Sequence, residues 1–257
     1  MGIINVTPDS FYVGSRKTSI PEIIGKASGL LDEGADFIDI GGYSSRPGAS
    51  RLSEQEEIQR VVPAISEIID RFPEAVVSID TFRSQVAMKA MDAGALMVND
   101  ISGGNMDPDM IHLVSERKVP YIIMHMRGTP ETMNTLTKYQ NLTVEVMDFF
   151  QSRVSELHSL GMTDIIIDPG FGFSKTVDQN YVLLKNLQYF KALELPILVG
   201  FSRKSMIFKT LGLGPEDALN GTTVLNTIAL QQGAGILRVH DVKEAVETIK
   251  LFNKTYN

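Results

Sequence analysis

The chain has 257 residues, a formal net charge of -7 and neither cysteine nor tryptophan. Because 43% of the residues are hydrophobic and 21% are charged, the composition supports a sizeable core and excludes intrinsic disorder. The acidic balance argues against nucleic acid as a partner, since that binding needs clustered lysine and arginine. The lack of cysteine excludes disulfides and thiolate metal sites. No apolar run is long enough to span a bilayer, so we expect a cytoplasmic protein without a membrane partner.

Short apolar runs alternate with amphipathic helical segments along the whole chain. Eight runs predict β-strands, at residues 2–6, 36–40, 75–80, 95–99, 119–125, 163–168, 195–201 and 235–239. Several consist almost entirely of Ile, Val and Leu, as expected for parallel strands covered on both faces. Eight units of about 32 residues favour an α/β fold, a (β/α)8 TIM barrel that forms a single domain over residues 1–257. A doubly wound open sheet is the alternative, because periodicity alone does not separate the two folds.

Helix boundaries are marked by capping residues. A Ser or Asp followed three positions later by Glu predicts helix starts at residues 19, 53 and 241. Gly34 follows the first of these helices and predicts its end, since glycine readily adopts the left-handed conformation found there.

A polar residue lies at or near the end of every expected strand. In a barrel the active site lies at the carboxyl ends of the strands, so these side chains are expected to share one rim. In chain order they are Asn5, Asp39, Asp80, Asn99, Asp100, His125, Asp168, Lys204, Arg238 and His240.

These strand-end residues suit two kinds of chemistry. The carboxylates and amides suit an NH-rich heterocycle, because a carboxylate matches a cyclic guanidine edge as it matches arginine. Lys204, Arg238 and His240 have the opposite sign and suit a carbonyl or a phosphate. Asn5 near such an anion would help to bind magnesium, which prefers oxygen ligands. A set of internal ion pairs, such as Asp168 with Lys204, is the alternative interpretation.

Seven motifs follow one another along the chain. They are GIINVTPDSF at 2–11, DIGGYSSRPG at 39–48, SIDT at 78–81, VNDISG at 98–103, DPGFGF at 168–173, GFSRKS at 200–205 and RVHDV at 238–242. In this order they resemble the dihydropteroate synthase family of pterin-binding TIM barrels, over essentially the whole chain. The resemblance implies a transferase of folate biosynthesis. It would condense 6-hydroxymethyl-7,8-dihydropterin diphosphate with para-aminobenzoate to give 7,8-dihydropteroate and diphosphate.

The resemblance also implies a role for each matching residue. The pterin would be held by Asp80, Asn99, Asp168 and Lys204, with Met124 and Phe173 as pocket walls. The diphosphate would be held by Asn5, Arg238 and His240, with Asn5 also on the cofactor Mg2+. The aminobenzoate site would be formed by Phe11, Arg46, Pro47 and Ser205. The catalytic residues would be Lys204, Arg238, His240 and Asp9. A homodimer and sensitivity to sulfonamides, which mimic aminobenzoate, are further implications.

One motif departs from the family pattern. Where the family usually reads Gly-Gly-Glu-Ser-Thr-Arg-Pro-Gly, Tyr43 replaces the acid and Ser45 replaces the threonine. Two other functions stay open. A related pterin-binding barrel passes a methyl group from a folate to a corrinoid protein, but would not need the anion-binding segments Ser202-Arg203-Lys204 and Arg238-Val239-His240. A non-catalytic pterin-binding protein is favoured only by Tyr43.

Overall fold

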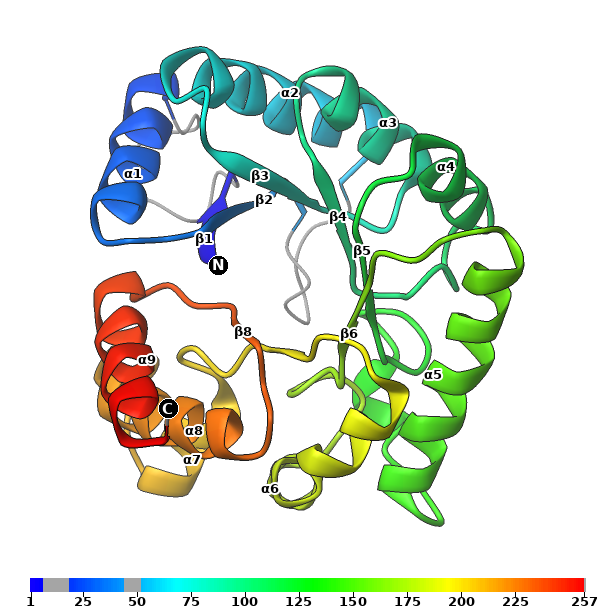
Figure 1. Cartoon of the computed structure of the whole chain (residues 1–257), viewed down its shortest axis with the longest axis vertical. Coiled ribbons are helices and arrows are strands. Elements are labelled where there is room, and N and C mark those ends of the chain that lie inside the picture. The colour runs from blue at the N-terminus through cyan, green and yellow to red at the C-terminus, as the bar shows by residue number, and fades with distance from the viewer. Residues whose placement is uncertain (7–18, 44–51, 257) are drawn as a thin grey trace.

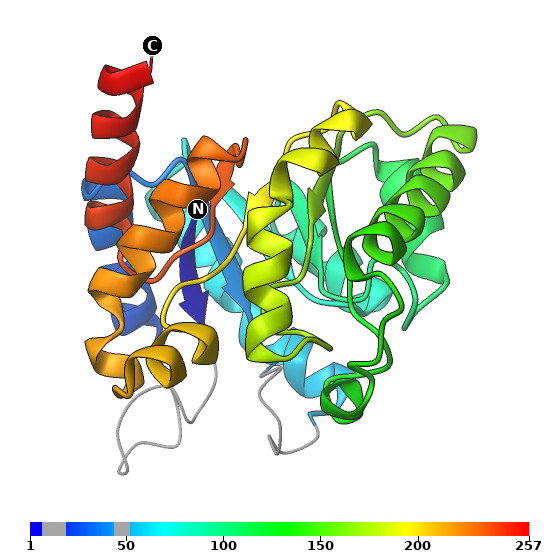
Figure 2. The same cartoon turned by 90° about the horizontal axis from the view of Figure 1, so that it is seen from below.

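The structure is a computed structural model that describes residues 1–6, 19–43 and 52–256. Within these residues eight strands alternate with helices, and the helices form an outer ring around the strands (Figures 1 and 2). The strands are β1 (Gly2–Asn5), β2 (Phe37–Gly41), β3 (Val76–Asp80), β4 (Met97–Asp100), β5 (Tyr121–Met124), β6 (Ile165–Asp168), β7 (Leu198–Val199) and β8 (Ile236–Leu237).

The described residues form nine α-helices and three short 3-10 helices. The α-helices are α1 (Ile20–Asp32), α2 (Glu54–Arg71), α3 (Ser84–Asp92), α4 (Asp109–Arg117), α5 (Leu142–Ser159), α6 (Val177–Lys185), α7 (Ser205–Leu211), α8 (Leu219–Gln231) and α9 (Val242–Tyr256). The 3-10 helices are η1 (Met133–Thr135), η2 (Leu187–Leu193) and η3 (Pro215–Asp217). In the described part of the chain, no helix is both long and apolar enough to cross a membrane.

The strands close into a ring in chain order. β1 to β6 form one parallel sheet, and β7 pairs in parallel with β8 in a second sheet. Bridged residue pairs join the two sheets on both sides, Ile167 with Ile197 and Gly2 with Val239. This order confirms the (β/α)8 barrel and excludes the doubly wound sheet, in which the strand order reverses at a switch point.

All eight expected strands are present, and several are shorter than predicted. The largest difference is at β7, where the expected range 195–201 contains a ladder only at Leu198–Val199. Pro196 has no N–H to donate to a ladder, and the carbonyl of Phe201 already accepts the N–H of Lys204 in a turn at 2.9 Å. The apolar run therefore continues beyond the hydrogen-bonded strand on both sides.

The predicted helix starts are confirmed. The backbone N–H of Ser19 donates to Glu22 Oε2 at 2.9 Å before α1, and Ser53 does the same to Glu56 before α2. Gly34 follows α1 with φ +96°, the conformation that its position predicted. α9 begins after Asp241 as expected.

Two apolar layers position the site. One fills the barrel interior from the first halves of the strands and consists of Met1, Met97, Ile122, Ile166 and Leu198. The larger one lies between the sheet and the helices and includes the fully buried Tyr121, Phe150 and Phe190. Polar strand-end residues therefore lie on an apolar floor, as in other barrels of this kind.

Candidate active site

Arg238 brings together residues from three strands at the carboxyl rim. Arg238 follows β8, and its Nε donates to Asp39 Oδ2 on β2 at 2.6 Å. Its Nη2 donates to Asp80 Oδ2 at the end of β3, also at 2.6 Å. Asn99 on β4 donates Nδ2 to the same Asp39 oxygen at 3.0 Å. Three predicted site residues thus form one network, as the strand-end pattern predicted.

Asp39 is the centre of this network, although the sequence-based assignment gave it no binding role. The side chain is fully buried, and Oδ1 has no hydrogen-bond partner among the described residues. Ile38 and Ile40 on either side of it belong to the core under the helices, so the alternation of a strand turns Asp39 into the barrel. In the sequence, an acidic residue between two isoleucines of an apolar strand is the pattern that indicates such an inward-facing carboxylate.

The ion-pair alternative is correct for Arg238 and not for Lys204. Within the described residues Arg238 pairs with two carboxylates. Lys204 Nζ instead donates to the carbonyl of Phe171 at 2.6 Å and lies 4.8 Å from the centre of the Phe173 ring. Asp168 Oδ1 accepts the backbone N–H of Gly170 at 2.8 Å. Lys204 and Asp168 can therefore still form hydrogen bonds to a ligand.

Burial sets the protonation behaviour of the rim. It raises the pKa of Asp80 to about 7, and the Arg238 guanidinium opposes the rise. It also raises the pKa of Asp168, which the Lys204 ammonium opposes. For Lys204, burial lowers the pKa to about 8 and Asp168 opposes the change. Strong pKa shifts of this kind are common where ligands bind.

His240 is neutral near pH 7, which corrects its expected positive charge. Burial lowers its pKa to about 4, and the nearby Arg238 lowers it further. Its Nδ1 lies 3.0 Å from Ser202 Oγ, and that hydroxyl also accepts the His240 backbone N–H at 3.1 Å. Neutral His240 can therefore donate an imidazole N–H to an anion, but it carries no positive charge.

Apolar side chains form one wall of the rim. Met124 at the end of β5 belongs to a cluster with Phe82, Ile101, Met126 and Met133, against which Tyr43 and Phe173 pack. The Tyr43 ring makes an edge contact with Phe82, with ring centres 5.3 Å apart. The residue that departs from the family pattern thus adds to the apolar wall.

The remaining predicted residues divide between the rim and segments that the structure does not describe. Asn5 ends β1 and pairs in register with Gly41 of β2. Ser205 begins α7 directly after Lys204. Asp9, Phe11, Arg46 and Pro47, together with Ser45, lie outside the described residues.

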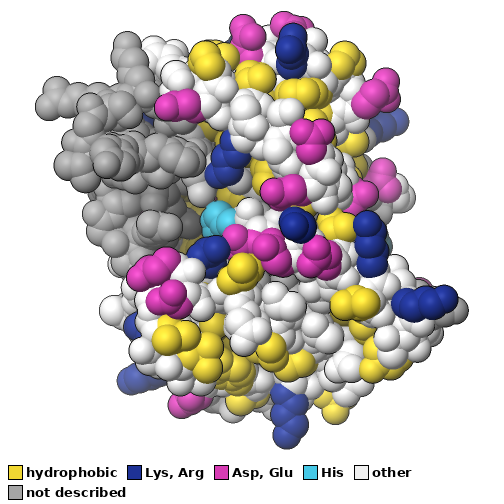
Figure 3. Space-filling view, turned by 90° about the vertical axis from the view of Figure 1, so that its left-hand side faces the viewer, with side chains coloured by type: hydrophobic (Ala, Val, Ile, Leu, Met, Phe, Trp, Pro, Cys, Tyr) yellow, Lys and Arg dark blue, Asp and Glu magenta, His cyan; other side chains and the backbone are white. Residues whose placement is uncertain are grey.

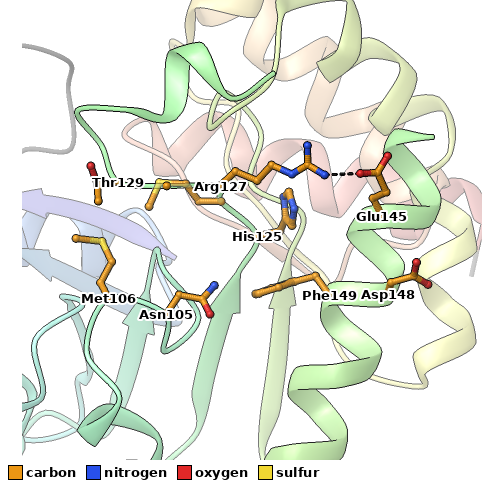
Figure 4. A pocket seen from close by; sticks show the side chains of 10 residues that line it. Asn105, Met106, His125, Arg127, Thr129, Glu145, Asp148 and Phe149 are labelled. Carbon is orange, nitrogen blue, oxygen red and sulfur yellow. Dashed lines mark hydrogen bonds and ion pairs between the residues drawn. The ribbon is translucent and has the colours of Figure 1, made fainter. Parts of the chain in front are cut away.

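A separate hollow of about 810 Å³ lies beside the β5 end and contains none of the assigned residues (Figure 4). Two of its lining residues, Arg127 and Glu145, form an ion pair, and the His125 ring makes an edge contact with Phe149 at 5.2 Å. His125, one of the strand-end residues expected at the rim, is 3% exposed and also lines this hollow. On the face in Figure 3, acidic and basic side chains are interspersed rather than gathered by sign.

Comparison with known proteins gives a consistent result. A family model described as "Pterin binding enzyme" matches residues 1–240. Dihydropteroate synthase from Escherichia coli K12 is 41% identical over 257 residues, 99% of this chain and 90% of the relative. The structure of Yersinia pestis dihydropteroate synthase with a sulfonamide drug complex has a TM-score of 0.93 at 39% identity, covering 99% of this chain and 92% of that one. Xanthomonas albilineans dihydropteroate synthase with 4-aminobenzoic acid has a TM-score of 0.92 at 36% identity, covering 99% and 91%.

Proposed function

The chain belongs to the dihydropteroate synthase family of pterin-binding enzymes, and from that premise we propose how its rim residues share the reaction. The enzyme is a transferase of folate biosynthesis with small-molecule substrates. It condenses 6-hydroxymethyl-7,8-dihydropterin diphosphate with para-aminobenzoate and releases 7,8-dihydropteroate and diphosphate. The observation that carries the residue assignment is Arg238 bonded to both Asp39 and Asp80, because it places a fixed cation beside a pterin-binding acid.

In the pterin subsite, carboxylates and an amide receive the N–H groups of the ring. Asp80 ends β3 and Asp168 ends β6, and Asn99 is oriented by its bond to Asp39. Lys204 lies between Phe171 O and the Phe173 ring, where its remaining N–H groups can donate to a pterin carbonyl. Met124 and Phe173 supply the apolar walls. The two carboxylates also favour positive charge that develops on the ring as the diphosphate leaves.

In the diphosphate subsite, Arg238 and His240 stabilise the leaving group. The methylene carbon of the pterin loses its C–O bond to diphosphate and gains a C–N bond to the amine of aminobenzoate, which loses a proton. The aromatic amine is already a fair nucleophile, so most of the protein's contribution is electrostatic. Arg238 supplies charge and His240 an N–H donor.

Magnesium fits this rim as an ion shared with substrate. Among residues 1–6, 19–43 and 52–256, no three His, Asp or Glu side chains gather as a metal site. Mg2+ commonly takes one or two protein oxygens together with water and substrate phosphates, and the amide oxygen of Asn5 suits that role. When bound, the ion would neutralise charge on the leaving diphosphate.

The aminobenzoate subsite combines Ser205 with residues outside the described ranges. Family resemblance assigns Phe11, Arg46 and Pro47 to this subsite and Asp9 to catalysis. Arg46→Ala should raise KM for aminobenzoate and leave pterin binding largely unchanged. Unaltered aminobenzoate kinetics would remove Arg46 from the subsite.

The test is release of diphosphate that depends on para-aminobenzoate. Lys204→Ala and Asp168→Asn should lower turnover severely while circular dichroism shows an intact fold. Lys185→Ala, at an exposed lysine in the last turn of α6, is the matched control. Near-normal product formation by either site variant would refute its assignment. Calorimetry with pterin diphosphate, followed by aminobenzoate, separates turnover from the passive binding that a non-catalytic module would give.

The known relatives also bear on the other two functions. They are synthases, and the rim retains Lys204 and Arg238, which methyl transfer to a corrinoid protein would not need. We also propose that residues 1–257 act as one domain, that the enzyme is a homodimer, and that it works in the cytoplasm. The absence of cysteine is compatible with a reducing compartment, and sedimentation velocity tests the dimer.

A further inference from the structure

Lys175 is a buried lysine with no role in the assignments above. Its side chain lies behind the pterin rim, and the residue is only 8% exposed. The ammonium nitrogen lies 3.0 Å from the carbonyl oxygens of both Gly170 and Phe173. It also lies 3.1 Å from His125 Nδ1 and 3.4 Å from the His125 carbonyl oxygen. Within the described residues, the hydrogen-bond partners of this amine are therefore four uncharged acceptors.

The turn that these contacts hold also carries pterin-site groups. Gly170, Gly172 and Ser174 have φ of +74°, +83° and +48°, so left-handed residues alternate along the segment. That alternation turns the Gly170 and Phe173 carbonyls towards Lys175. The carbonyl between them, Phe171 O, is the acceptor for Lys204. The Gly170–Ser174 segment therefore supplies carbonyl acceptors to both Lys175 and Lys204.

The outer side of the turn is anchored as well. Ser174 Oγ accepts the backbone N–H of Arg127 at 3.0 Å, and Ser174 O accepts the Tyr139 hydroxyl at 3.0 Å. These bonds tie the turn to the segment after β5, beside the hollow of Figure 4, in which His125 and Arg127 are drawn. On the inner side of the turn, Lys175 donates to the carbonyls of Gly170 and Phe173.

The charges around Lys175 come from three elements. Asp168 on β6 favours its protonated form, whereas Lys204 and Arg127 disfavour it. Burial is the largest influence and lowers the Lys175 pKa to about 7. His125 is neutral, because burial and the neighbouring Lys175 lower its pKa to about 2. His125 Nδ1 can therefore accept a hydrogen bond from the amine.

We propose that Lys175 is a positioning residue, whose amine holds the Gly170–Ser174 turn in the shape that orients Lys204 and Phe173 for the pterin. A neutral side chain of the same length would leave buried carbonyls without a donor, which is costly, and the turn would relax. This inference rests on the proposed function of the rim. Lys175 itself acts through the turn rather than on the substrate.

The absence of native cysteine allows a precise replacement of the amine. In Lys175→Cys the only thiol is at this position, and alkylation of the unfolded chain followed by refolding makes it accessible. The thiolate displaces bromide from 2-bromoethylamine and forms a side chain as long as lysine that ends in an amine. With 1-bromopropane the same displacement gives a neutral side chain of equal length. Lys185→Cys, treated identically, controls for alkylation and refolding.

The aminoethyl protein should retain kcat/KM for pterin diphosphate within about threefold of wild type. The propyl protein and Lys175→Met should lose about 10- to 100-fold, with KM for aminobenzoate changed less than about threefold. Because sulfur makes the aminoethyl amine less basic, an alkaline fall in kcat/KM that comes from position 175 should move to lower pH in that protein, whereas one that comes from Lys204 should not move. A merely structural lysine would lower the melting temperature without this selectivity.

Three outcomes would overturn the inference. The first is full pterin kcat/KM in the folded propyl protein, and the second is an equal loss for both substrates. The third is failure of the amine to restore activity in a protein that refolds. If the neutral variants do not fold, His125→Phe removes one acceptor while retaining an aromatic ring, and unchanged pterin kinetics there would count equally against it. Absence of aminobenzoate-dependent diphosphate release in wild type would instead refute the proposed function.

Discussion

Arg238 donates its Nη2 hydrogen bond to Asp80 Oδ2 at 2.6 Å. One is proposed to stabilise the leaving diphosphate and the other to bind the pterin ring. A substrate that carries both groups offers each residue a new partner, whereas a pterin without diphosphate has only the ring to compete with the existing bond. We therefore expect the pair to couple recognition of the two ends of the substrate.

This coupling predicts a non-additive pair of substitutions. Asp80→Asn and Arg238→Met should each lower kcat/KM for pterin diphosphate by about 10- to 100-fold, since each loses hydrogen bonds to a charged partner. Removal of both should cost less than the product of the single losses, because the second change removes a partner already lost. Steady-state kinetics of the three variants measure the coupling, with exposed Asp178→Asn as the control. Independent effects that multiply would show that the pair does not link the subsites.

Gly170 predicts a steric effect on stability. A β-carbon at Gly170 would overlap the carbonyl oxygen of His125, and the residue also has φ +74°. Gly170→Ala should destabilise the fold by about 3 kcal/mol, through overlap and backbone strain together. Gly161 has a similar φ of +78° but open space around its β position, so Gly161→Ala should cost about 1 kcal/mol. Equal losses in urea titrations of the two variants would refute the steric account.

Acid stability should depend on His125 and His240. Their folded pKa values are about 2 and about 4, below the unfolded value of about 6.5. Between these limits the unfolded chain binds more protons, so stability falls as pH decreases below about 6.5. Asp80 acts in the opposite direction, because its folded pKa is raised to about 7.

Comparison of variants isolates the histidine contribution. His125→Phe should reduce the loss of unfolding free energy between pH 6.5 and 5 by up to about 1.4 kcal/mol per pH unit. Exposed His158→Gln is the control. Thermal melts at several pH values measure both slopes. The same slope in His125→Phe as in wild type would mean that His125 is not the titrating group.

We predict that Arg203 stabilises the fold and does not bind the diphosphate. It donates Nε and Nη2 to the two oxygens of Asp241 at 3.0 and 2.8 Å, and Nη1 to the carbonyl of Glu216 at 2.7 Å. Since the pair is partly exposed, Arg203→Ala should cost about 1 kcal/mol, or about 2–4 °C of melting temperature. KM for pterin diphosphate should stay within about threefold. A large rise in that KM at unchanged melting temperature would identify Arg203 as a diphosphate ligand.

The barrel and its rim could be predicted because strand periodicity and strand-end polarity are local signals. In the sequence, each apolar run has a polar residue at or near its end. Parallel topology then brings the carboxyl ends of the strands, and these polar residues with them, to one rim. Asp80, Asn99 and Arg238 meet in this way. The extent of β7 could not be predicted from its apolar run, because the ladder ends where Pro196 and the turn after Gly200 limit pairing.

The support behind the rim was harder to predict. Lys175 follows Gly-Phe-Gly-Phe-Ser, and only the left-handed residues of the folded turn direct its amine back to Gly170. The charge of His240 depends on burial that no local pattern reveals. Asp39 was visible as an acid in an apolar strand, but its link to Arg238 joins residues 199 positions apart.

The two sheets of the barrel divide the proposed site. Asp39, Asp80, Asn99 and Asp168 belong to the six-stranded sheet, whereas Lys204 and Arg238 follow the two strands of the smaller one. A bound pterin diphosphate would brace the two sheets against each other. The amide protons of Ile3 and Ile167 cross the seams, to Val239 O and Pro196 O at 3.0 Å each. Their exchange with deuterium should therefore slow when the substrate binds, although neither residue touches it.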